Sequence, residues 1–152
     1  MKASAGTPMM GVDANGLAQF FRADPAGGIP SSPVPAGATV LTASSGNVAA
    51  ASAVATFAAA VGVTNYVTGF TITGAGATAA SIVLATLAGI LGGTATFVVA
   101  VPAGATLALP TLTVTFPQPI PASAANIAIV LTLPSLGTGN TNAAVVMHGF
   151  KI

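Results

Sequence analysis

The sequence contains almost no ionic side chains, no cysteine and no tryptophan. Only 3% of its 152 residues are charged, against roughly 25% in an average soluble domain. Between Asp24 and Lys151 there is no Asp, Glu, Lys or Arg at all. The lack of cysteine excludes disulfide bonds, and a net charge of +1 attracts neither nucleic acid nor anionic lipid. The surface of this segment must therefore be Ser, Thr, Asn, Gly and Ala, or be covered by other chains.

The side chains that carry catalysis and bind metals are also scarce. General acid and base catalysis needs paired titratable groups, yet the only side-chain carboxylates are Asp13 and Asp24. His148 is the sole histidine, so a histidine-rich metal site is excluded, and a Ser-His-Asp arrangement would need one of these two aspartates. No phosphate-binding loop with a lysine is present. We therefore expect a protein that is not an enzyme and has neither a metal nor a cofactor.

An uncharged run over residues 79–101 has the length of a membrane-spanning helix, about 20 residues. Three glycines, Gly89, Gly92 and Gly93, interrupt it, and β-branched residues crowd its second half. No Lys or Arg flanks the run to fix an orientation in a bilayer. We therefore expect strands in this run and no membrane as a partner.

The clearest local pattern is an alternation of apolar and polar residues over 111–116, which reads TLTVTF. Its apolar residues share one parity and its threonines the other, the period of two that is typical of a strand with one buried face. A second alternating run covers residues 127–133 and ends at Pro134. Between the two runs, the prolines of residues 117–121 are expected to end the first strand, because proline has no amide hydrogen to donate.

Short runs of this kind, separated by turn residues, continue from residue 38 to the end of the chain. This spacing predicts an all-β fold, an antiparallel β-sandwich of the jelly-roll type with about eight strands. The expected strands are residues 38–42, 48–56, 65–73, 81–88, 94–101, 106–116, 125–133 and 143–152. The strand at 48–56 has a helical alternative, because alanine favours helix and apolar residues recur there at helical spacing.

Residues 1–37 differ from the remainder and are predicted to form an extended N-terminal arm, with the sandwich at 38–152. The segment holds four of the five charged residues and is rich in proline and glycine, a composition that cannot pack a core. Asn15 could cap a short helix over 16–23. The alternative is a turn that packs aromatic side chains against the sandwich. We expect the arm to anchor onto a neighbouring subunit through Leu17, Phe20, Phe21 and Arg22.

The single histidine lies in the last predicted strand. His148 shares its parity with Val146 and Phe150, which predicts a packed face on which the imidazole ring is hydrogen-bonded. The alternative interpretation places His148 in a contact between subunits.

Four segments of the chain resemble a widespread group of virion proteins from tailed bacteriophages and prophages. They are TNYVTGF at 64–70, GATAAS at 76–81, FPQPIPASAAN at 116–126 and NTNAAVVMHGF at 140–150. The resemblance implies a structural component of the particle and supplies no catalytic residue. Proteins of this kind are often capsid decoration, or cement, proteins: β-sandwich homotrimers on the exterior of the capsid, bound to the lattice of the major capsid protein.

Two other functions remain open at this stage. A module of a tail fibre or baseplate could bind a receptor on the host surface, although this chain offers no tryptophan for a sugar platform. The threonine ladder at Thr111, Thr113 and Thr115 suggests an ice-binding protein.

Overall fold

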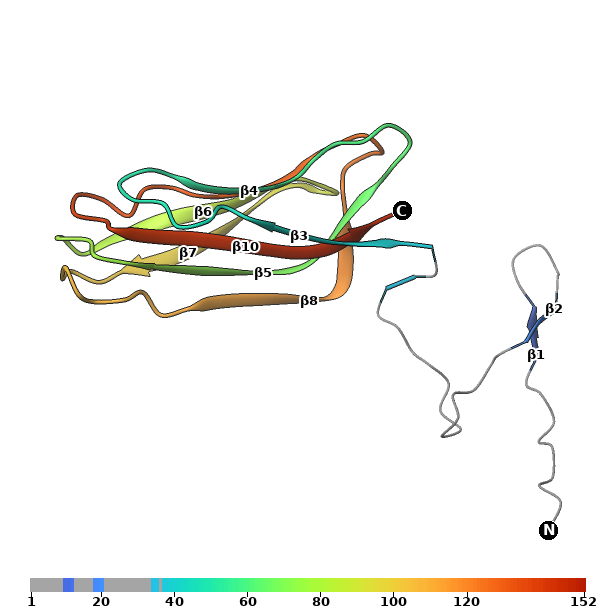
Figure 1. Ribbon diagram of the computed structural model, residues 1–152, viewed down its shortest axis with the longest axis horizontal. Helices are drawn as coiled ribbons and strands as arrows, with labels where there is room; N and C mark the ends of the chain where they lie inside the picture. Colours follow the sequence, from blue (N-terminus) through green and yellow to red (C-terminus); the bar gives the residue numbers. More distant parts are fainter. Residues whose placement is uncertain (1–9, 13–17, 21–33, 36) are drawn as a thin grey trace, which may run out of the picture. The chain divides into compact units, whose positions relative to one another are not determined.

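The computed structural model describes residues 10–12, 18–20, 34–35 and 37–152 (Figure 1). The chain forms two compact units, residues 1–35 and 36–152. In the first unit, β1 (Met10–Val12) pairs antiparallel with β2 (Ala18–Phe20). The predicted helix over 16–23 is therefore wrong where the structure describes it.

Within residues 37–152 the chain forms eight strands in two four-stranded antiparallel sheets, which confirms the predicted all-β sandwich. The strands are β3 (Thr39–Ser44), β4 (Ala53–Phe57), β5 (Asn65–Ala75), β6 (Ser81–Ile90), β7 (Gly93–Val101), β8 (Leu112–Pro121), β9 (Ile129–Leu133) and β10 (Asn142–Lys151). The uncharged run at 79–101 supplies β6 and β7. Among the described residues no helix has the length and apolar character needed to cross a membrane.

The pairing of the strands is that of a long hairpin rolled onto itself. The innermost pair is β6 with β7, and β5 with β8, β4 with β9, and β3 with β10 follow outward. Rolling adds the pairs β10 with β5 and β6 with β9. The sheet orders are thus β3-β10-β5-β8 and β4-β9-β6-β7, the two layers seen in Figure 1. This is the arrangement of an eight-stranded jelly roll.

The core lies between the two sheets and is built from alternate residues of the strands. Burial alternates along β4 and β9, whose inward residues are fully enclosed. Phe70 on β5 lies at the centre, with its ring edge-to-face against Phe97 on β7 at a centroid distance of 4.8 Å. The predicted parity of 111–116 is confirmed, since the apolar residues are half-buried and the threonines are exposed.

Three predicted strands start later in the structure, and the strand expected at 125–133 is β9, which starts only at Ile129. The strand expected at 48–56 is β4, which starts only at Ala53, and the helical alternative is wrong. The strand expected at 106–116 is β8, which starts at Leu112 and continues through three prolines to Pro121. The prolines do not end β8 because it is an edge strand, so only one side of its backbone needs amide donors.

The end of β8 links the two sheets. The amide of Ala122 donates to the Asn65 carbonyl of β5 at 2.7 Å, while the carbonyl of Pro121 accepts from the Leu91 amide, just after β6, at 2.8 Å. Figure 1 shows the chain turning here from one layer to the other. Pro121 therefore lies at a corner of the sandwich, where a residue without an amide hydrogen costs no ladder bond.

Candidate interaction surface

The outer face of sheet β4-β9-β6-β7 carries a patch of exposed apolar side chains on its last two strands. Ile82 and Leu84 on β6 are 70% and 51% exposed, and Val98 on β7 is 66% exposed. Leu84 pairs with Val98 and Ile82 with Ala100 across the two strands. These four residues, which we call the outer β6–β7 strip, therefore form one continuous patch.

The strip is unusual because the same two strands are also apolar on their inner face. Ala85 and Leu87 of β6 and Val99 and Val101 of β7 are buried in the core. A strand that is apolar on both sides is typical of the interior of a protein, where both of its faces are covered. Nearer the turn, β7 presents Thr94 and Thr96 on the outer face, so the apolar part is confined to the strip. The sequences of β6 and β7 are thus suited to a covered outer face that the single chain leaves open.

β7 is also an edge strand with an unprotected backbone. It lies at the end of its sheet, so one side of its nine residues has no ladder partner within residues 37–152. The other edge strands of the sandwich are shorter, as β3 and β4 are, or carry prolines, as β8 does. β7 has neither proline nor charge, the two devices that usually prevent pairing at an edge.

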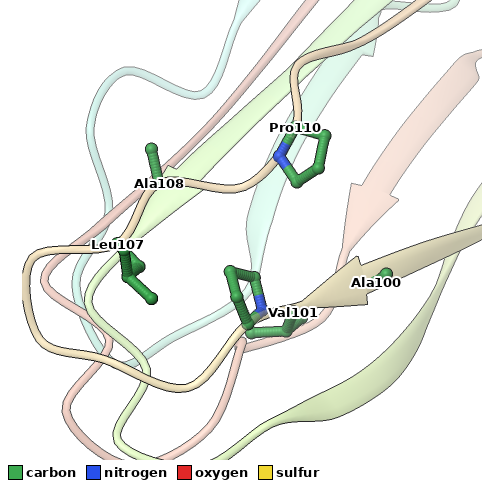
Figure 2. Close-up of a pocket in the computed structure, with 6 residues that line it drawn as sticks. Ala100, Val101, Leu107, Ala108 and Pro110 are labelled. Carbon is green, nitrogen blue, oxygen red and sulfur yellow. The ribbon is translucent and has the colours of Figure 1, made fainter.

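A shallow apolar hollow lies beside the free edge of β7. It has a volume of about 380 Å³. Its lining residues are Ala100, Val101, Pro102, Leu107, Ala108 and Pro110. Figure 2 shows Leu107 and Pro110 on the connection to β8, across from Val101 at the end of β7. A smaller hollow of about 170 Å³ continues along β7 at Val98 and Thr111. The open side of the sandwich between β7 and β8 is therefore apolar and concave.

The titratable residues of the sandwich lie on the opposite sheet. His148 and Lys151 both belong to β10. His148 is exposed, between Thr42 on β3 and Gly69 on β5. The prediction that it occupies a packed face is wrong, because even-numbered residues in this part of β10 point outward from the sandwich. Phe150 shares that direction and is covered by stacking on Tyr66, at a centroid distance of 4.9 Å.

The outer face around β5 and β8 is rich in threonine. Thr111, Thr113 and Thr115 are exposed along β8 and its approach. Thr113 pairs with Thr71 of β5, and their hydroxyl oxygens are 3.5 Å apart. Threonines also lie on the outer face of the other sheet, where Thr96 of β7 pairs with Thr86 of β6 next to the apolar strip.

The structure does not test the predicted contacts of the N-terminal segment. Phe20 is the last residue of β2, while Leu17, Phe21 and Arg22 lie outside the described residues. Among the described residues no group of side chains could hold a metal ion.

The outer β6–β7 strip was not predicted from the sequence. The signal available was the run SIVLATLA at 81–88, which is apolar on both parities. Parity alone did not reveal which side of this run faces the core. Comparisons with protein families, with curated proteins and with solved structures found no match.

Proposed function

We propose that this chain is a structural protein of a tailed-bacteriophage virion, a capsid decoration or cement protein on the exterior of the shell. Its copies associate, as homotrimers, and bind the lattice of the major capsid protein. The observation that carries the proposal is the outer β6–β7 strip in a sandwich that has no charged residue between positions 37 and 150. Surfaces of this kind are favourable when other subunits cover them.

The architecture supports the proposal by analogy. Eight-stranded jelly rolls occur in viral capsid proteins and in lectins, although a fold alone does not define a function. The four segments that resemble tailed-phage virion proteins cover parts of β5, β8 and β10, which belong to one sheet, and the corner after β8. Together these features favour a structural role in a particle over a catalytic one.

Such a protein would stabilise a shell by mass action. A ligand that binds assembled subunits, and not dissociated ones, adds its binding free energy to the stability of the assembly. Contacts that bridge two neighbouring capsid subunits are lost when the subunits separate. A cement protein therefore raises the free energy needed to separate them. An uncharged interface also loses little strength in high salt, because there are no ion pairs to screen.

Add-back to bare shells tests this function. Capsid shells assembled without the chain should lose their contents at a lower temperature than shells to which the purified chain has been added. The matched control is bare shell with an equal amount of an unrelated protein. Equal survival of bare and decorated shells under heat and osmotic shock would remove the proposed role. Antibody labelling confined to the tail would instead support the receptor-binding alternative.

The threonine face supports a second candidate, an ice-binding protein. Thr71 and Thr113 pair across β5 and β8, and Thr111 and Thr115 extend the array. An ice-binding chain would produce thermal hysteresis, and Thr113→Lys would abolish it. If a solution of the purified wild-type chain shows no thermal hysteresis, this candidate is excluded.

A further inference from the structure

We propose that the free edge of β7, with the outer β6–β7 strip, is the contact through which one copy of this chain binds a second copy, an edge strand of which extends the sheet. This inference deepens the proposed function by naming the surface of self-association. It depends on that function only for its biological setting, because contact between copies can be measured without a capsid.

The main chain of β7 supplies the first reason. β7 (residues 93–101) pairs with β6 on one side, and on the other side every second residue directs its N–H and C=O away from the sheet. An added strand satisfies these groups with main-chain hydrogen bonds, as in β-strand addition between proteins. Within residues 37–152, β7 is the longest edge strand that lacks proline.

The side chains on both sides of this edge supply the second reason. Val98 and its neighbour Leu84 lie on the outer face, where alternate side chains of an added strand would contact them. The intervening side chains would point toward the hollow lined by Val101, Leu107 and Pro110. An added strand would therefore bury apolar surface on both of its faces.

The charge pattern identifies a second copy as the partner. The surface beside β7 has no cation or anion, so it offers nothing to an acidic or basic peptide, and an equally uncharged edge of a second copy meets it without repulsion. The strand that must be added is uncharged and rich in small and β-branched residues. β4, the opposite edge of the same sheet, has this composition with the sequence AVATF, and its contact with β7 of another copy is head-to-tail, as a homotrimer requires.

Two lysine substitutions form a matched test. Val98 on β7 is 66% exposed and Val40 on β3 is 67% exposed, and both strands are sheet edges. Val98→Lys should raise the dissociation constant between copies by at least about tenfold, because the contact would bury an unpaired charge. Val40→Lys should leave the constant unchanged. Sedimentation velocity of the full-length chain gives both values, and thermal melting checks that each variant is folded.

Amide hydrogen exchange separates strand addition from simple packing of faces. The outward amides of β7 should exchange slowly in the wild-type assembly and rapidly in Val98→Lys. Leu84→Lys, on the neighbouring strand, should weaken the assembly as well. A monomeric wild-type chain, equal effects of Val98→Lys and Val40→Lys, or unprotected β7 amides in the assembly would each overturn the inference. An assembly that responds as expected but never binds a shell would contradict the proposed function alone.

Discussion

Asn65 connects three backbone segments at one end of the sandwich through its side-chain amide. Its side chain is buried, and the Nδ2 atom lies 3.3, 3.0 and 3.2 Å from the carbonyl oxygens of Phe57, Ala58 and Ile127. These carbonyls belong to the end of β4 and the segments next to β4 and β9. The amide thus replaces ladder hydrogen bonds where the strands stop, which satisfies buried backbone groups that would otherwise be costly.

Removal of this amide should destabilise the sandwich. We expect Asn65→Ala to lower the free energy of unfolding by about 2 kcal/mol, because buried carbonyls lose their donor. Asn65→Asp should lower the free energy of unfolding more than Asn65→Ala does, since a carboxylate oxygen would then face carbonyl oxygens. Asn47→Ala is the control, because Asn47 is exposed and donates only to the side chain of Asn142. Urea unfolding measures all three, and an Asn65→Ala variant as stable as Asn47→Ala would contradict this account.

At the scale of elements, periodicity predicted where most strands lie but not where each strand sits in its sheet. The alternation around 112–116 and 129–133 identified the buried faces of β8 and β9. The same reasoning failed at the prolines of β8, because edge position depends on tertiary topology. The outer β6–β7 strip was missed for a similar reason, since Ile82 and Leu84 alternate with residues that are equally apolar. An alternating pattern identifies a buried face only when the two faces differ.

The β6–β7 hairpin depends on one glycine near its turn. The register of β6 shifts between Leu87 and Ile90, and Gly89 within this bulge has φ of +81°. A Cβ at Gly89 would also overlap the carbonyl oxygen of Ala128. Gly89→Ala should therefore lower the free energy of unfolding by about 3 kcal/mol, because the positive φ and the overlap both destabilise the folded state.

Gly92 provides the matched control for this prediction. It has a similar φ of +95°, but a Cβ there would meet nothing within 4 Å. Gly92→Ala should therefore lower the free energy of unfolding by only about 1 kcal/mol, which is the penalty of the backbone conformation alone. Chemical denaturation of both variants gives the difference, and equal costs would show that the close approach of Ala128 is unimportant.

For the whole molecule, the sandwich is a compact unit with its own core. Residues 36–152 form one unit and residues 1–35 another, and the buried side chains described above all belong to the sandwich. The composition of the sequence, with nearly all the charge and much of the proline in the first segment, predicts an arm over 1–37 and a sandwich over 38–152, and this division stays a prediction.

A fragment of residues 36–152 should therefore fold alone. Its thermal midpoint should stay within about 2 °C of the full-length value, which corresponds to less than about 1 kcal/mol for a domain of this size. Circular dichroism at 218 nm, a wavelength typical of β-sheet, follows the transition. A fragment that melts at a much lower temperature would show that residues 1–35 contribute to the stability of the sandwich.

A three-dimensional image reconstruction of the intact particle tests the central claim most directly. The proposed function predicts density for the jelly roll on the exterior of the shell, in clusters of contacting copies, with β7 and the outer β6–β7 strip at the contact. A shell without this density, or isolated copies that leave the strip exposed to solvent, would contradict it.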